Sequence, residues 1–94
     1  MKLNKYNREF ILDRIEKLKE DKSTKMVARE SYISKELKEV NEKYHKASTE
    51  GKNEDRAVKD LEIANSLIFS WDIDIMLMEN NIETLKEILI NNEY

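Results

Sequence analysis

The chain has 94 residues, a formal net charge of −3 at pH 7, and equal shares of charged and hydrophobic residues, 39% each. The absence of cysteine excludes a disulfide framework and thiolate chemistry, and no apolar run reaches the length of about 18 residues that a membrane span requires. The regular spacing of apolar residues excludes disorder despite a mean hydropathy of −0.79. We therefore expect a single cytoplasmic domain over residues 1–94, with no membrane partner.

Charge is distributed unevenly along the chain. Residues 1–52 carry 14 basic and 10 acidic side chains, a net charge of +4, whereas residues 53–94 carry 3 basic and 10 acidic ones, a net charge of −7. The two halves either attract each other, within the fold or across a dimer, or the acidic half faces a basic partner. Both interpretations stay open from the sequence.

The first predicted helix covers about residues 4–20. Ile11, Ile15 and Leu18 recur at intervals of three and four, which is the spacing of one helix face. Continued at the same spacing, this stripe meets only cations, namely Lys22, Lys25 and Arg29. The stripe therefore predicts a turn near residues 21–24.

The second predicted helix covers about residues 24–49. Its apolar seam has heptad-like spacing and consists of Met26, Ile33, Leu37, Val40, Tyr44 and Ala47. Gly51, the only glycine, stands where a helix ends in a left-handed residue, and Asn53 is a suitable N-cap for a following helix. This punctuation predicts a tight helix–turn–helix at residues 49–53.

The third predicted helix covers about residues 54–91, with a possible kink at Asn80–Asn81. Ten apolar residues alternate at intervals of four and three without a break: Ala57, Leu61, Ala64, Ile68, Trp71, Ile75, Met78, Ile82, Leu85 and Leu89. A second apolar stripe, formed by Phe69, Ile73 and Met76, lies on roughly the opposite face. A helix that is apolar on two sides is expected to be central in its assembly.

These elements predict an all-α fold, an antiparallel helical hairpin in a coiled-coil-like bundle of three or four helices that self-associates through the second stripe. The alternative is a closed monomer in which the first helix covers that stripe. Asp72 and Asp74 border the stripe and give it a charged rim, which is the usual anatomy of an interface. The predicted partner or self-association residues are therefore Phe69, Ile73, Met76, Asp72 and Asp74.

Catalysis is not expected from this set of residues. Glu42 and His45 form one E-x-x-H pair, which is half of a di-iron motif, and a solvated histidine is the simpler interpretation. No metal site, cofactor or catalytic group is predicted, and the chain is not expected to be an enzyme. Because the basic residues of the first half are interleaved with acidic ones, direct binding of nucleic acid is not expected either.

One segment carries a family resemblance. Residues 51–64, GKNEDRAVKDLEIA, resemble the turn and second-helix start of phage helical-hairpin proteins that sequester cyclic-nucleotide signals of bacterial immunity. The shared elements are Gly51, a basic Lys52, Ala57 and the run Leu61-Glu62-x-Ala64, whereas the residues after Ala64 do not match. The resemblance implies a non-enzymatic oligomer that binds small dianions, with phosphate contacts from Lys52, Arg56 and Lys59.

The leading functional prediction is a non-enzymatic helical interaction protein. It would be a small regulator or inhibitor, phage-encoded and acting against host defence, that binds and blocks a host protein through its acidic half. One alternative is an oligomeric sponge for a cyclic nucleotide. A second alternative is a purely structural oligomerisation module.

Overall fold

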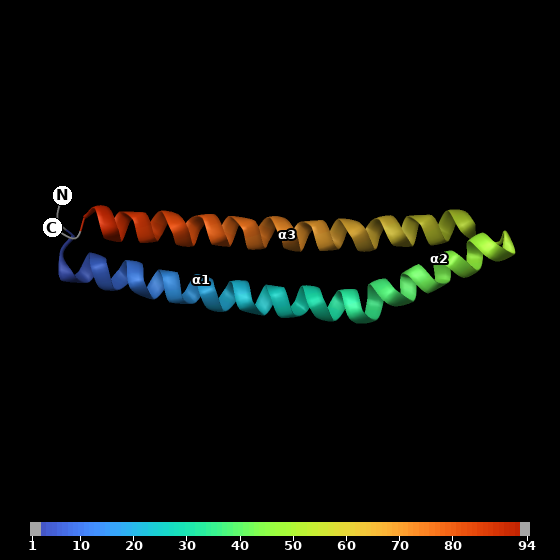
Figure 1. The fold of residues 1–94 in the computed structure, drawn as a ribbon, viewed down its shortest axis with the longest axis horizontal. Coiled ribbons are helices and arrows are strands. Elements are labelled where there is room, and N and C mark those ends of the chain that lie inside the picture. The colour runs from blue at the N-terminus through green and yellow to red at the C-terminus, as the bar shows by residue number, and fades with distance from the viewer. Residues whose placement is uncertain (1–2, 93–94) are drawn as a thin grey trace.

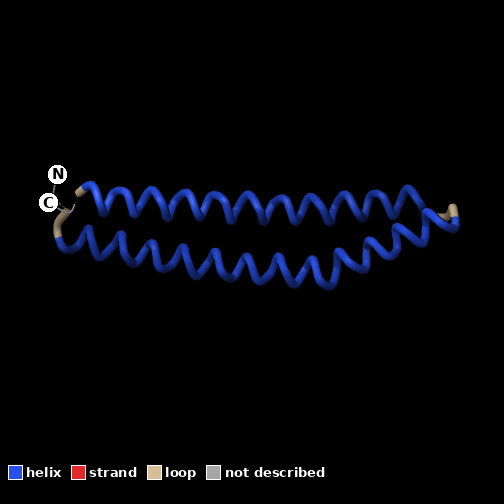
Figure 2. Tube along the Cα trace, in the orientation of Figure 1, coloured by secondary structure: helices blue, strands red, loops and turns tan. Residues whose placement is uncertain are grey.

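The computed structural model describes residues 3–92, and these form a hairpin of two helical arms (Figure 1). The first arm is a continuous helix made of α1 (Lys5–Tyr32), the π-helical turn η1 (Ile33–Leu37) and α2 (Lys38–Glu50). The second arm is α3 (Glu54–Asn91). Within residues 3–92 no strand is found (Figure 2). The molecule measures 68 × 18 × 13 Å, and its radius of gyration of 20.6 Å far exceeds the roughly 12 Å of a compact chain of this length.

Short-range hydrogen bonds define both ends of the hairpin. Asn4 caps α1, because its side-chain oxygen accepts a hydrogen bond of 2.8 Å from the backbone N–H of Asn7. Gly51 has φ +67° and its N–H donates to the carbonyl of Ala47 at 2.8 Å, which ends α2 in a left-handed residue as expected. Asn53 precedes α3 in the left-handed region as well, without the expected side-chain cap.

The predicted turn near residues 21–24 is wrong. α1 runs through this region without a break, so the described chain has two helical arms rather than three or four helices. Lys22, Lys25 and Arg29 continue the seam of Ile11, Ile15 and Leu18, and each of the three cations forms an ion pair with a carboxylate of α3. Their aliphatic stems cover the neighbouring helix while their charged ends reach carboxylates, which long cationic side chains do readily. At these positions the seam is held by ion pairs instead of apolar contacts, and the helix continues through them.

The π-helical turn η1 explains why the two apolar stripes of the first arm are out of phase. Continued from Arg29 at the original spacing, the seam would reach positions 32, 36, 39, 43 and 46. The apolar residues instead stand one position later, at Ile33, Leu37, Val40, Tyr44 and Ala47. A π-helical turn accommodates one extra residue without interrupting the helix, so both stripes face α3. Met26, predicted on the seam, is 46% exposed instead.

The core is a narrow seam between the arms. Its main cluster lies toward the chain termini and contains Ile11, Ile15, Leu18, Ile82 and Leu89. Toward the turn the buried residues are alanines, at 47, 57 and 64, so the arms meet there through small side chains. Between these regions, Tyr32 and Trp71 form an edge-to-face pair with ring centroids 5.3 Å apart.

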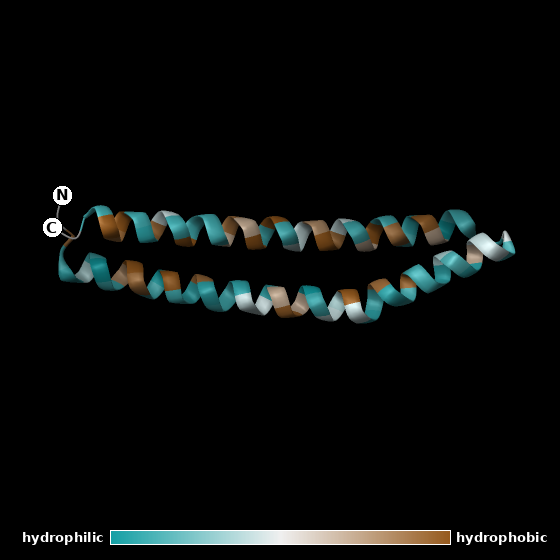
Figure 3. Cartoon of the chain, viewed as in Figure 1, coloured by the Kyte–Doolittle hydropathy of each residue, from teal (hydrophilic) through white to brown (hydrophobic). Residues whose placement is uncertain are grey.

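α3 covers Glu54–Asn91, the range expected from its seam, and passes through Asn80 and Asn81 without a break. All ten seam positions of α3 are buried or half-buried. The second stripe is not covered, since Phe69, Ile73 and Met76 are 64%, 37% and 51% exposed. The closed monomer, with the first helix on that stripe, is therefore wrong. Figure 3 shows that hydrophobic residues, in brown, alternate with hydrophilic ones along both arms.

Among the described residues, no helix combines the length and the apolar character that crossing a membrane would require.

Candidate nucleic-acid interface

A groove at the closed end of the hairpin collects basic side chains from both arms. This tip groove has a volume of about 470 Å³, and its floor contains the two buried alanines Ala47 and Ala57. Its remaining lining residues are exposed and polar: Lys43, Lys46, Glu50, Lys52, Asn53, Arg56 and Asp60. Four cations and two carboxylates therefore surround the groove, which gives it a positive balance.

The local fold explains why these cations meet. Lys43 and Lys46 are three residues apart on α2, so they share one side of the helix. The left-handed Gly51 reverses the chain within a few residues and brings Lys52 and Arg56 to the same end. Because alanines occupy the contact between α2 and α3, the arms approach closely and the basic side chains project around a shallow floor.

Most cations of the tip groove form no ion pair within the described residues. Lys43 pairs with Glu39 at 3.6 Å, but both side chains are about two-thirds exposed, and such a pair contributes little stability. Within the described part of the chain, Lys46, Lys52 and Arg56 have no ion pair. Their positive charge is therefore available to an anionic ligand.

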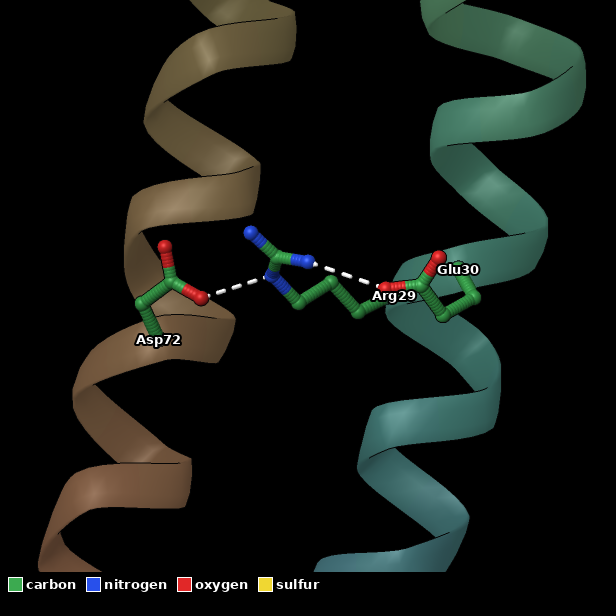
Figure 4. A network of polar contacts seen from close by, with 3 residues as sticks. All are labelled: Arg29, Glu30 and Asp72. Carbon is green, nitrogen blue, oxygen red and sulfur yellow. Dashed lines mark hydrogen bonds and ion pairs between the residues drawn. The ribbon is translucent and has the colours of Figure 1, made fainter.

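The cations in the middle of the hairpin are engaged instead. Lys22 pairs with Glu79 at 3.1 Å and Lys25 with Asp74 at 3.3 Å. Arg29 Nε contacts Asp72 Oδ1 at 2.6 Å, and Arg29 Nη1 also contacts Glu30 at 3.2 Å (Figure 4). We call the three ion pairs between the arms, Lys22–Glu79, Lys25–Asp74 and Arg29–Asp72, the ion-pair ladder. The interpretation that the basic and acidic halves attract each other within the fold is confirmed by this ladder.

The interface and phosphate-binding residues predicted from the sequence lie in three different regions of the structure. Asp72 and Asp74 form ion pairs with Arg29 and Lys25 of the first arm, and their role at an interface stays a prediction. Phe69, Ile73 and Met76 are exposed on α3, away from the tip. Of the three predicted phosphate contacts, Lys52 and Arg56 line the tip groove and Lys59 does not.

The sequence interpretation missed Lys43 and Lys46. The signal that could have found them is their three-residue spacing on the last turns of a helix that ends at a glycine. His45, next to them, is exposed and makes an edge contact with the Tyr44 ring, with centroids 5.8 Å apart. Among residues 3–92, no group of three or more His, Asp or Glu side chains could hold a metal ion.

One comparison with known proteins gives a match. The family model of the adenosine deaminase z-alpha domain matches residues 4–52, slightly more than half of the chain. No curated protein and no solved structure matches. The matched range begins at Asn4, the N-cap of α1, and ends at Lys52, just after Gly51. It therefore corresponds to the first arm of the hairpin.

This match overturns several expectations. The resemblance of residues 51–64 to phage cyclic-nucleotide sponges is wrong, because the matched family is a nucleic-acid-binding one. The predicted phage anti-defence inhibitor that blocks a host protein, its sponge alternative and the purely structural module are wrong for the same reason. So is the expectation that the partners are a host protein or a small nucleotide rather than nucleic acid.

The physical reason for the last error is visible in the hairpin. Basic and acidic residues alternate along the first arm, so a count along the sequence finds no positive stripe. In the folded hairpin, carboxylates of α3 form ion pairs with the central cations of the first arm. The cations that line the tip groove are not paired with α3 in this way. On the match of residues 4–52, the chain belongs to the adenosine deaminase z-alpha domain family.

Proposed function

We propose that this protein binds a Z-form nucleic acid duplex through phosphate contacts at the tip groove, without catalysis. The family assignment points to Z-form nucleic acid as the ligand class. The observation that carries the proposal is the position of the groove, because Lys43, Lys46 and Lys52 lie within the matched residues 4–52. Arg56 of α3 completes the basic set.

The chemistry of these side chains suits phosphate. Lysine ammonium groups attract phosphate as point charges, and the arginine guanidinium can donate two parallel hydrogen bonds to phosphate oxygens. Contacts of this kind position a protein on a duplex without reading its bases. Recognition would therefore follow the path of the phosphate backbone, which is where the left-handed and right-handed duplexes differ.

Binding without catalysis is supported by the residue composition. Enzymes that deaminate nucleobases hold a zinc ion with histidine and cysteine ligands. This chain has one histidine and no cysteine, and His45 is exposed at the side of α2. The cytoplasmic location expected from the sequence stays a prediction.

The direct test uses an alternating CG duplex locked in the left-handed form by base bromination, and a right-handed duplex of the same length. Fluorescence anisotropy measures the affinity for each, and circular dichroism reports the handedness of the bound duplex. We expect the left-handed duplex to bind at least tenfold more tightly. Absence of binding to both duplexes would overturn the proposed function, and equal affinities would overturn the preference for the Z form.

A pair of charge-matched variants locates the site. Lys46→Glu combined with Arg56→Glu reverses two cations of the tip groove, and we expect a loss of affinity of at least a hundredfold. Lys17→Glu combined with Lys35→Glu changes the net charge equally on exposed positions of the first arm outside the groove. Equal losses for both variants would show that the tip groove is not the binding site.

We also propose that the hairpin self-associates through the exposed stripe of α3. The accessible surface is 7406 Å², about 1,700 Å² more than the roughly 5,700 Å² typical of a compact monomer of 11.2 kDa. This excess is comparable to the area buried in a standard protein interface. Light scattering at micromolar concentration tests the proposal, and a mass near 11.2 kDa would contradict it.

A further inference from the structure

The outward face of α3 has a symmetric arrangement of residues. Ten positions on the side opposite the seam follow one another at intervals of 3-4-3-4-4-3-4-3-4, and all ten are exposed. Apart from the last interval, which leads to Asn91, the intervals read the same in both directions from Ile73. The residues are Lys59, Glu62, Ser66, Phe69, Ile73, Leu77, Asn80, Thr84, Glu87 and Asn91. We call this set the back stripe.

We infer that a second copy of this hairpin packs antiparallel on the back stripe, with the two-fold axis at Ile73. The inference rests on the proposed self-association and specifies its geometry. About such an axis, Ile73 meets its own copy and Phe69 meets the partner's Leu77. Lys59 then meets the partner's Glu87, and the axis generates the Phe69–Leu77 and Lys59–Glu87 contacts twice.

Charge selects the antiparallel arrangement. In a parallel dimer in register, each residue of the back stripe faces its own copy, so Lys59, Glu62 and Glu87 would each oppose a like charge. In the antiparallel dimer, Lys59 opposes a carboxylate and Glu62 opposes the uncharged Thr84. Ser66 and Asn80, both polar and small, also face each other. The face is therefore complementary to itself in one direction only.

The position of the axis favours the same arrangement. Ile73 stands at the midpoint of α3, whose bounds are Glu54 and Asn91. Antiparallel packing about it therefore overlaps the two α3 helices along their full length of about 57 Å. It places Phe69, Ile73 and Leu77, which are 64%, 37% and 51% exposed in the single hairpin, at the centre of the interface. Apolar residues at the centre and charged pairs toward both ends match the anatomy of stable interfaces.

The geometry has a consequence for the proposed function. The tip groove lies at one end of a hairpin 68 Å long, so an antiparallel dimer has one tip groove at each end, facing away from each other. One dimer would then hold two separate duplex segments. A parallel dimer would instead bring both grooves to one end.

Cysteine crosslinking tests the geometry, because the chain has no cysteine of its own. Glu62 and Thr84 each lie 11 residues from Ile73, on opposite sides. In the antiparallel dimer, two copies of either residue are about 33 Å apart, far beyond the reach of a disulfide. We expect Glu62→Cys and Thr84→Cys to stay uncrosslinked alone and to form a mixed disulfide when combined. Ile73→Cys, at the axis, should crosslink to itself.

The outcomes separate this inference from the proposals on which it depends. Self-crosslinking of Glu62→Cys or Thr84→Cys would indicate a parallel dimer and overturn the inference while leaving self-association intact. A dimeric mass without any of these crosslinks would place the interface elsewhere, which also overturns the inference. A monomeric mass would overturn both the inference and self-association. None of these results alters the test of nucleic-acid binding.

A charge-exchange series gives a second, independent test. Lys59→Glu creates two repulsive contacts in the antiparallel dimer, and we expect its dissociation constant to rise roughly five- to tenfold. Adding Glu87→Lys should restore the affinity of the original dimer. Lys17→Glu, on the first arm, is the matched control and should leave the constant unchanged. Failure of Glu87→Lys to restore dimerisation would contradict the proposed register.

Discussion

The middle and the tip of this hairpin are both rich in cations, yet they use them differently. In the middle, Lys22, Lys25 and Arg29 occupy half-buried seam positions, and each is paired with a carboxylate of α3. At the tip, Lys46 and Arg56 are exposed beside a floor of alanines, and neither forms an ion pair within the described residues. Position relative to the seam therefore decides whether a cation holds the fold together or is available to a ligand.

The largest expected contrast between the two regions is in their response to salt. If four tip cations neutralise phosphates, raising the salt from 50 to 200 mM should weaken binding of the locked left-handed duplex by about 150-fold. The central ladder is partly shielded by the arms, so the midpoint of thermal unfolding should change by only a few degrees. Anisotropy titrations and thermal denaturation in the same buffers measure both. A salt-independent affinity would contradict phosphate contacts at the tip.

Reversing one charge of the ladder should affect the fold rather than the binding of nucleic acid. Arg29→Glu faces Asp72 across the arms, and we expect it to lower the free energy of unfolding by about 1–2 kcal/mol, a modest value because both side chains are partly exposed. Chemical denaturation followed by circular dichroism measures this loss. Combining it with Asp72→Arg should restore most of the stability. If the double variant is no more stable than Arg29→Glu alone, the contact does not contribute to the hairpin.

Truncating one tip cation should produce the opposite pattern. Lys46→Ala removes a single phosphate contact, so affinity should fall about five- to tenfold and the salt slope should decrease by about one. Because Lys46 is exposed and lies outside the core, the free energy of unfolding should change by less than about 0.5 kcal/mol. Lys17→Ala serves as the control, with no expected effect on either quantity. An unchanged affinity would remove Lys46 from the proposed site.

The smallest expected effect on stability and binding comes from a substitution in the turn that joins α2 to α3. Gly51 has φ +67°, and a Cβ added there would meet no atom within 4 Å, so Gly51→Ala is disfavoured by backbone conformation alone. We expect a loss of about 1 kcal/mol in the free energy of unfolding. The same strain should weaken nucleic-acid binding by two- to threefold, because Lys52 lies within the chain reversal and Arg56 follows it in the first turn of α3. A fully stable variant would show that the turn accommodates a side chain.

The parts of the fold predicted from the sequence are those governed by local spacing. The ten-residue seam of α3 predicted a helix over residues 54–91, and Gly51 predicted the turn, because both signals are contained within a few helical turns. The second apolar stripe was also visible in the sequence, whereas its exposure in the single hairpin was not, because the sequence allowed the first helix to cover it. The sequence match of residues 4–52 likewise required no structure to identify the family.

What only the tertiary structure decided depends on partners far away in the chain. The seam of the first arm continues through Lys22, Lys25 and Arg29 because carboxylates more than forty residues later lie opposite them. The one-residue change of phase is absorbed by η1, since pairing with a straight α3 favours a π-helical turn over a break. The tip groove likewise forms only when α2 and α3 pack side by side, because its lining comes from both arms. The net charge of a sequence segment is a sum over its residues. The electrostatic potential at a surface depends instead on which of those charges are paired with opposite charges in the fold.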